Sequence, residues 1–366
     1  MSTFEAAIQS YLGPVVGFLN DEAVSEVLIN GIDQIFVEIG GKLKLTDAKF
    51  DDEDQLMAAV NNIAQSVGRR INEENPRLDA RLPDGSRIHA VIPPVARNGT
   101  TISIRKFKKV EVTWKKYIEW GAVNVDGAQF LDACMFLGKN ILVSGGTGSG
   151  KTTLLNLLCG RVPRGQRILT IEDASELDIA YEHVVSFETR MADAQGKGEV
   201  SMQDLLKSAL RLRPDRIIVG EVRGAEALEL ISAMNTGHKG CLGTIHSNSP
   251  DDAMVRLESL AMSGETKISQ QAIQYQISSA IDLVVQISRL SDGSRRITDI
   301  SEVTGLDESG SYVTRHIYGL HNMKRTADGK MVGDLTATGN LPSFMEEIEN
   351  NRIPISRTKF QGKKAA

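Results

Sequence analysis

Hydrophobic and polar residues alternate in two different ways along the chain, and the pattern changes near residue 110. In the first part, turns separate short apolar strands, and Gly40-Gly41 and Asp84-Gly85 supply the positive φ angles that tight hairpins require. An apolar repeat with helical spacing lies between these turns, after the potential N-cap residues Asp51 and Asp52. The expected elements are hairpins over 35–46 and 77–92, a helix around 56–67 and a strand over 100–107. The pattern predicts a small α/β domain over residues 1–108 and a linker over 109–125.

After two helical segments around 114–121 and 128–138, short and almost wholly apolar runs alternate with helices. Such runs are typical of strands covered on both faces, as in a parallel sheet. We expect strands at 140–144, 167–171, 183–188, 216–220 and 241–245, and helices at 153–160, 202–212 and 225–235. Two further helices, a hairpin over 282–303 and a polar tail from about 320, with one helix near 343–350, complete a second domain over 126–366.

The composition is that of an ordinary globular protein, with 41% hydrophobic and 24% charged residues. The apolar runs, such as 140–144, are far shorter than the roughly 18 residues of a membrane span. The N-terminus contains Glu5 and no basic segment, so it does not resemble a secretory signal. Three widely spaced cysteines favour neither a disulfide framework nor a zinc site. We therefore expect a cytoplasmic protein.

The net charge of −5 is unevenly distributed. Residues 1–66 have a net charge of −8, whereas residues 67–120 have a net charge of +6. A basic stretch of this kind is suited to bind a nucleic acid, a polyphosphate or an acidic neighbouring subunit. No nucleic-acid motif accompanies it, so we expect no nucleic-acid partner.

The strongest chemical signal follows the strand at 140–144 and opens the next helix. It matches the pattern GxxxxGK followed by Ser or Thr, in which loop amides and the helix N-terminus surround a phosphate chain. Lysine then reaches the β- and γ-phosphates, and the hydroxyl binds Mg²⁺. The residues are Gly145, Gly146, Thr147, Gly148, Ser149, Gly150, Lys151 and Thr152, with Thr153 next.

Hydrolysis also needs an acid near the phosphates, and two strands end in one. Glu221 follows the strand at 216–220, and Glu172-Asp173 follows the strand at 167–171. The carboxyl ends of the strands are where ligands of open α/β sheets bind. A surface or helix-capping role is the alternative for these acids.

Two histidines, His238 and His246, bracket the strand at 241–245 without partners at metal-ligand spacing. His246 could sense a γ-phosphate, whereas a structural role is the common alternative for either histidine. Arg81, Arg87 and Arg105 lie in the first domain and offer planar cationic groups suited to phosphate oxygens. The alternative is that these arginines form ion pairs on the surface of the protein.

The chain resembles the type II/type IV secretion ATPase superfamily in an ordered set of motifs: RLPDGSRIHAVIPP, SIRKF, SGGTGSGKTT, TIEDASEL, ALRLRPDRIIVGEVRG and MNTGHKGCLGTIHSN. Within it, residues 12–345 resemble the tight-adherence (Flp) pilus assembly ATPases, the CpaF/TadA group, through VLING, DARLPDGSR, GRR, MNTGH and the DGSRR hairpin. The resemblance implies a RecA-like P-loop NTPase domain with a largely parallel sheet, preceded by a smaller α/β, PAS-like domain. It also implies a homohexamer with ATP bound between the two domains.

The resemblance assigns roles residue by residue. Glu221, Glu172, Arg87, Arg105 and His246 are expected to be catalytic, with Glu172 and Thr152 holding Mg²⁺. Arg223 and His238 are expected to contact the nucleotide together with the loop from Gly145 to Thr153. The expected reaction is Mg²⁺-dependent hydrolysis of ATP.

The same resemblance implies the setting of this reaction. The motor is expected at the cytoplasmic face of the bacterial inner membrane, where it drives pilus extension and possibly retraction. Its expected partners are inner-membrane platform proteins and, indirectly, pilin. Three alternatives remain open at this point: a conjugation or type IV secretion ATPase, a regulator that binds ATP without hydrolysing it, and a nucleic-acid translocase.

Overall fold

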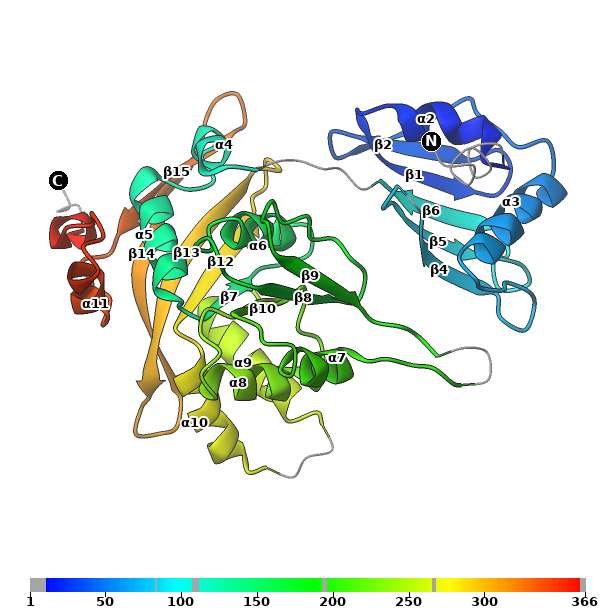
Figure 1. Cartoon of the computed structure of the whole chain (residues 1–366). Coiled ribbons are helices and arrows are strands. Elements are labelled where there is room, and N and C mark those ends of the chain that lie inside the picture. The colour runs from blue at the N-terminus through cyan, green and yellow to red at the C-terminus, as the bar shows by residue number, and fades with distance from the viewer. Residues whose placement is uncertain (1–10, 83, 107–111, 193–195, 265–267, 363–366) are drawn as a thin grey trace. The chain divides into compact units, whose positions relative to one another are not determined.

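The computed structural model describes residues 11–82, 84–106, 112–192, 196–264 and 268–362. The chain divides into two compact units, and the division falls between residues 110 and 111 (Figure 1). Each unit has a hydrophobic core of its own.

The first unit is a six-stranded antiparallel sheet with helices packed against it. The strands follow the order β3-β2-β1-β6-β5-β4, so two hairpin regions join where β1 pairs with β6. Both predicted hairpins are confirmed, and Gly40, Gly41 and Gly85 adopt the positive φ angles that their turns require. The elements are η1 (Gly13–Val15), α2 (Val16–Asn20), β1 (Val24–Asn30), β2 (Ile35–Ile39), β3 (Lys42–Leu45), α3 (Glu53–Ser66), β4 (Arg77–Arg81), β5 (Arg87–Val91) and β6 (Thr101–Arg105).

The core of this unit lies between α3 and one face of the sheet. The side chain of Asp52 caps α3 by accepting a hydrogen bond from the backbone N–H of Gln55 at 2.8 Å. In β6, Ile102 and Ile104 are buried in this core, whereas Arg105 is exposed on the other face.

The second unit is built on a nine-stranded sheet of order β15-β14-β13-β12-β7-β11-β10-β8-β9. The six strands from β12 to β9 in that order are parallel, and β13, β14 and β15 extend the sheet by antiparallel pairing. The strands are β7 (Ile141–Ser144), β8 (Ile168–Glu172), β9 (Val184–Glu188), β10 (Arg216–Val219), β11 (Leu242–Ile245), β12 (Leu283–Arg289), β13 (Arg295–Leu306), β14 (Tyr312–Arg325) and β15 (Met331–Ala337). The expected α/β fold with a mainly parallel sheet is confirmed.

Helices cover both faces of this sheet and bury two hydrophobic clusters. Residues of α5, α6 and α11 form one cluster with one face of the sheet, and residues of α7 to α10 form the other. Alternate residues of β7 serve the two clusters, with Val143 in the first and Leu142 in the second. The helices are α4 (Trp114–Glu119), α5 (Val125–Leu137), α6 (Lys151–Cys159), α7 (Met202–Ala209), α8 (Glu226–Asn235), α9 (Pro250–Ala261), α10 (Gln270–Ala280), α11 (Met345–Asn350) and η2 (Arg357–Phe360).

The structure corrects two features of the sequence interpretation. The segment from about 320 is not an irregular tail, because β14 and β15 form the antiparallel end of the sheet. Register shifts in both ladders interrupt the two-residue alternation by which strands are recognised. The first strand, β1, was also missed, although it lies at the centre of its sheet.

Of the interval interpreted as a linker, 109–125, residues 109–111 lie outside the described residues and the rest belongs to the second unit. It contains α4, whose Tyr117 is buried in the cluster formed with α5 and α6. The helix α5 begins within this interval, where Asn124 caps it by accepting from the backbone N–H of Gly127.

None of the helices in the described part of the chain combines the length and apolar character needed to cross a membrane. All three cysteines are buried and free of disulfides. Burial raises the pKa of the Cys241 thiol to about 12, so it stays protonated.

Candidate nucleotide site

The glycine-rich loop lies between the buried strand β7 and the helix α6, in the position that a phosphate-binding loop requires. Gly148 and Gly150 have φ angles of 69° and 98°, and Gly150 is the N-cap of α6. A Cβ atom on Gly145 would clash with the carbonyl oxygen of Ile287 in β12 and lie 2.5 Å from Ser149 Oγ. Positive φ angles thus favour glycine at positions 148 and 150, and the lack of space for a side chain favours it at position 145.

Lys151 is the first residue of α6 and folds back over the loop. Its Nζ donates to the carbonyl oxygens of Gly145 at 3.0 Å and Gly146 at 3.1 Å. It also lies 3.3 Å from Nδ1 of His246. Burial lowers the pKa of Lys151, while the nearby Glu221 carboxylate opposes that shift.

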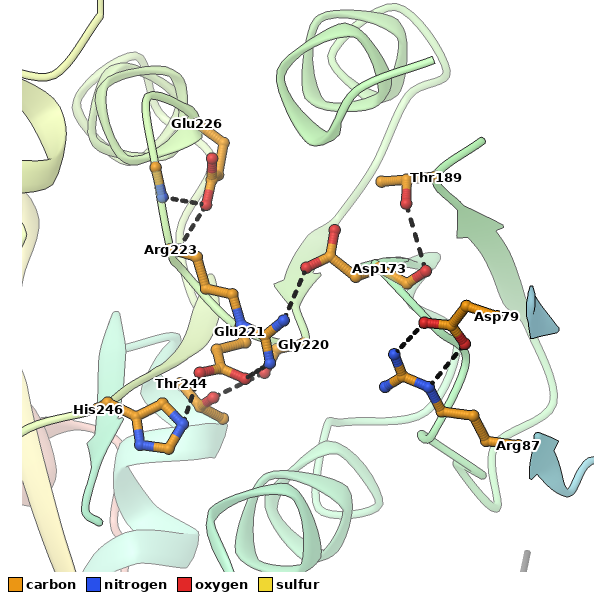
Figure 2. A network of polar contacts seen from close by, with 11 residues as sticks. Asp79, Arg87, Asp173, Thr189, Gly220, Glu221, Arg223, Glu226, Thr244 and His246 are labelled. Atoms are coloured by element: carbon orange, nitrogen blue, oxygen red, sulfur yellow. Dashed lines mark hydrogen bonds and ion pairs between the residues drawn. The ribbon is translucent and has the colours of Figure 1, made fainter. Parts of the chain in front are cut away.

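His246 and Glu221 connect the lysine to a chain of charged groups. Nε2 of His246 lies 2.7 Å from a carboxylate oxygen of Glu221, whose other oxygen accepts from Arg223 Nη2 at 2.5 Å. Arg223 also donates to Asp173 at 3.3 Å (Figure 2). The carboxyl ends of β8, β10 and β11 thus bring together residues that are far apart in the sequence.

The electrostatics of this cluster follow from its partial burial. Burial and the Lys151 cation lower the pKa of His246, which favours the neutral imidazole. Burial raises the pKa of Asp173, and the Arg223 guanidinium offsets part of that rise. A neutral His246 between Lys151 and Glu221 can accept a proton on one ring nitrogen and donate from the other.

Glu172 is buried at the end of β8, where its side chain holds the backbone of the turn that follows. Its Oε1 accepts from the backbone N–H groups of Glu176 at 2.9 Å and Leu177 at 3.0 Å. A Cβ on Gly220 would lie 2.8 Å from Cγ of Glu172, so the glycine before Glu221 leaves room for this side chain. Thr244 Oγ1 donates to the Gly220 carbonyl at 2.7 Å, which holds that turn from the next strand (Figure 2).

The Thr152 hydroxyl contacts an acid, Glu176. Thr152 Oγ1 donates to Glu176 Oε2 at 3.4 Å. The resemblance assigns Mg²⁺ to Thr152 and Glu172, whereas the carboxylate that contacts the Thr152 hydroxyl is that of Glu176, the third acid after the same strand. The position of Glu176 depends on the turn that Glu172 holds, which periodicity does not reveal.

The two predicted histidines lie at opposite ends of β11. His246 follows the carboxyl end of the strand and joins the cluster, whereas His238 precedes the strand and contacts Ala233 of α8 through both its backbone and its ring. A strand places its two flanking residues at its opposite ends, so His238 and His246 do not lie together within this unit, and the nucleotide contact of His238 stays a prediction.

The arginines of the first unit form a row across its sheet. Arg81 lies opposite Arg87 in the β4–β5 pair, and Arg87 lies opposite Arg105 in the β5–β6 pair. Arg87 forms a bidentate ion pair with Asp79 at 2.6 and 3.1 Å (Figure 2). Like charges directly opposite one another are unfavourable, so the row is suited to an anionic ligand or partner.

Comparisons with known proteins agree with this geometry. The chain matches the Type II/IV secretion system protein family over residues 9–329. A putative conjugal transfer protein of Mycobacterium tuberculosis is 35% identical over 289 residues, which are 77% of this chain and 82% of that protein. The type IV secretion system protein VirB11 of Bartonella quintana is 32% identical over 331 residues, covering 81% of this chain and 92% of the relative.

Solved structures have the same fold at lower sequence identity. The pilus retraction motor PilT with bound ADP aligns with a TM-score of 0.57 and 21% identity, covering 97% of this chain and 90% of that one. The ATPase DotB of Legionella pneumophila aligns with a TM-score of 0.55 and 21% identity, covering 83% of this chain and 82% of that one. The family match spans most of both units, and the chain belongs to the type II/IV secretion system protein family.

Proposed function

We propose that this protein hydrolyses ATP to ADP and phosphate as the motor of a secretion or pilus machine. The observation that carries the proposal is the contact chain from Lys151 of the phosphate-binding loop through His246 to Glu221. It joins a cation for the phosphates to a carboxylate that can act on water.

The residues of the cluster divide the chemistry among them. The loop amides and Lys151 bind the phosphates and stabilise the charge that develops on them. Glu221 orients the attacking water and accepts its proton, while His246 and Arg223 hold the two carboxylate oxygens in place. Arg87 and Arg105 supply further positive charge for the γ-phosphate.

The donor set near Thr152 suits Mg²⁺, which prefers oxygen ligands and keeps several waters. Among the described residues no three His, Cys, Asp or Glu side chains gather into a metal-binding group. That agrees with an ion held mainly by phosphates and water, with the Thr152 hydroxyl as the protein ligand. The Glu176 carboxylate lies beside that hydroxyl, and Glu172 supports it through the turn. Bound Mg²⁺ would neutralise phosphate charge.

Replacing Glu221 by Gln separates binding from hydrolysis. The amide keeps the shape of the side chain and removes the proton acceptor, so turnover should fall at least about a hundredfold. ATP should still bind, whereas Lys151→Ala should weaken both binding and turnover. The readout is phosphate release together with calorimetric affinity, and Glu308→Gln, an exposed acid of the same unit, serves as the control. Turnover near the wild-type rate in Glu221→Gln would assign water activation to another acid.

We propose pilus assembly of the tight-adherence type as the process that this motor drives. This finer proposal rests on the motifs VLING and DARLPDGSR and on the DGSRR hairpin. The motor would be a homohexamer at the cytoplasmic face of the inner membrane, acting on platform proteins and through them on pilin. The second candidate is conjugation or type IV secretion, which the names of the relatives in Mycobacterium and Bartonella favour.

Deletion of the gene in its source organism distinguishes the two processes. A pilus motor predicts loss of surface pili, with their return on expression of the wild type but not of Lys151→Ala. A transfer motor predicts normal pili and a loss of DNA transfer or protein secretion.

A further inference from the structure

The hairpin formed by β12 and β13 packs directly against the phosphate-binding loop. The carbonyl oxygen of Ile287 occupies the space beside Gly145, and the Ile287 side chain lies 3.6 Å from a Cβ built on Gly150. Arg295 covers the same glycine, with its Cδ 3.1 Å from that Cβ position. The loop is thus supported by a second element besides β7 and α6.

The side chain of Arg295 links this hairpin to the loop backbone: its Nε donates to the carbonyl oxygen of Gly148 at 2.9 Å. Arg295 is the first residue of β13, and two residues later the backbone N–H of Ile297 donates to the Ala122 carbonyl at 2.8 Å. The Ile297 side chain is fully buried. The arginine therefore extends from a fixed strand.

Cationic side chains bind three carbonyl groups of the loop. Lys151 binds those of Gly145 and Gly146, and Arg295 binds that of Gly148. A peptide group whose carbonyl is held has its N–H fixed in the opposite direction. In a phosphate-binding loop the N–H groups are the ligands of the phosphates. Holding the carbonyls therefore preorganises the amides before the nucleotide arrives.

A second arginine lies beside the first. Arg289 pairs directly with Arg295 across the β12–β13 ladder, and its Nη1 lies 3.9 Å from a Cβ built on Gly148. Two arginines opposite one another are unfavourable in an isolated hairpin. Next to a loop that binds a polyphosphate, the same pair adds favourable positive potential.

We propose that Arg295 is a positioning residue of the nucleotide site, which acts through the Gly148 carbonyl to hold the loop in its phosphate-binding conformation. The inference rests on the proposed binding of nucleotide. It adds Arg295 to the residues that the sequence motifs assign to nucleotide binding. An arginine that holds the loop affects the binding of every nucleotide that contacts the loop. The affinities for ADP and ATP should therefore depend on it equally. Equal effects on ADP and ATP binding would distinguish this role of Arg295 from a direct contact to the γ-phosphate.

The test uses two uncharged substitutions of similar length, of which one keeps an N–H donor and the other has none. The bond to Gly148 is made by Nε, which is separated from Cα by three carbons, as is Nε2 of glutamine. Arg295→Gln therefore places a neutral N–H donor at the same depth, whereas Arg295→Met has a similar length and no donor. Calorimetry on the full chain would measure the affinity for ADP with Mg²⁺ and for a non-hydrolysable ATP analogue.

Arg295→Met should weaken both affinities about tenfold, the effect of losing one charge-assisted hydrogen bond. Arg295→Gln should stay within about threefold of the wild type. The control is Arg325→Met, because Arg325 donates to Ser291 at the turn of the same hairpin and to the Gly329 carbonyl, away from the loop. It should stay within about twofold.

Three outcomes would overturn the inference. Equal losses in Met and Gln variants would show that charge matters and not the hydrogen bond, and a loss for the ATP analogue alone would indicate a γ-phosphate contact. A melting temperature of the nucleotide-free Met variant more than about 5 °C below that of the Gln variant would show a general structural role. If the wild type itself binds no nucleotide, the proposed function fails, which is a different result from any of these.

Discussion

Two adjacent glycines of the phosphate-binding loop differ in what surrounds them, and this difference gives a stability test. Gly145 lies against β12, so an added methyl group would clash with the Ile287 carbonyl and with Ser149 Oγ. Gly146 has nothing within 4 Å of a Cβ position. Overpacking of a fixed site costs about 1–3 kcal/mol. For a unit of this size we expect a melting temperature about 2–4 °C lower for each kcal/mol.

Thermal melting of Gly145→Ala and Gly146→Ala without nucleotide measures this difference. Gly145→Ala should melt several degrees below the wild type, at about 2–4 °C for each kcal/mol lost, and Gly146→Ala should melt close to it. Equal melting temperatures would mean that β12 does not restrict the loop, and would also weaken the case for Arg295 on the neighbouring strand.

Elements with strong local signals could be predicted from the sequence, and those whose signals are interrupted could not. The strand β7, the loop and α6 are marked by an apolar run, glycines and a lysine at fixed spacing, and the structure has them at those positions. The strands β14 and β15 are largely exposed or half-buried, and register shifts break their alternation. They are defined by pairing, β14 with β13 and β15 with β14, which is a tertiary property.

The same distinction holds for the residues of the candidate site. Glu221 and Lys151 are local features, because each follows a buried strand or fills a motif position. Glu176 depends on a turn held by Glu172, and Arg295 depends on the pairing of β12 with β7, which brings a distant hairpin to the loop. The sequence contains a clue to Arg295, since Arg289 and Arg295 flank the turn at 290–294 at paired positions. It became interpretable only with the sheet order.

At the scale of the whole molecule, each unit has its own concentration of groups suited to phosphate oxygens. The second unit has the loop with Lys151, and the first has the row of Arg81, Arg87 and Arg105. Two of these arginines differ in their surroundings: Arg87 is paired with Asp79, whereas Arg105 is exposed and lies opposite Glu26 of β1. We propose that the row is a second source of positive charge for the nucleotide, from the same subunit or from a neighbour in the hexamer.

Arg105 is the member of the row that we expect to distinguish ATP from ADP. Its strand is anchored by Ile102 and Ile104 in the core, so the arginine can be removed without a change in packing. A contact to the γ-phosphate is made only with ATP, and a ligand shifts a conformational equilibrium only through such differential binding. Arg105→Ala should therefore weaken the ATP analogue about tenfold or more and ADP less than about threefold, with a matching fall in turnover. Arg105→Lys should restore only part of the affinity, because a point charge lacks the planar fork.

The matched control is Arg77→Ala, which removes an arginine of β4 that pairs with Val91 at the other end of the same sheet. If Arg105 acts only by general electrostatic attraction, the two variants should lose similar affinity, and the affinities for ADP and the ATP analogue should fall in parallel. This loss should become smaller as salt is added. A γ-phosphate contact predicts a selective loss in Arg105→Ala that persists at moderate salt, because a direct charge-assisted hydrogen bond is screened less than an attraction acting over a distance longer than the Debye length. Titrations of both variants with both nucleotides at two salt concentrations decide between these mechanisms. Parallel losses would leave Arg105 as part of the general positive potential of the first unit and would move the recognition of the γ-phosphate to Lys151 and His246 alone.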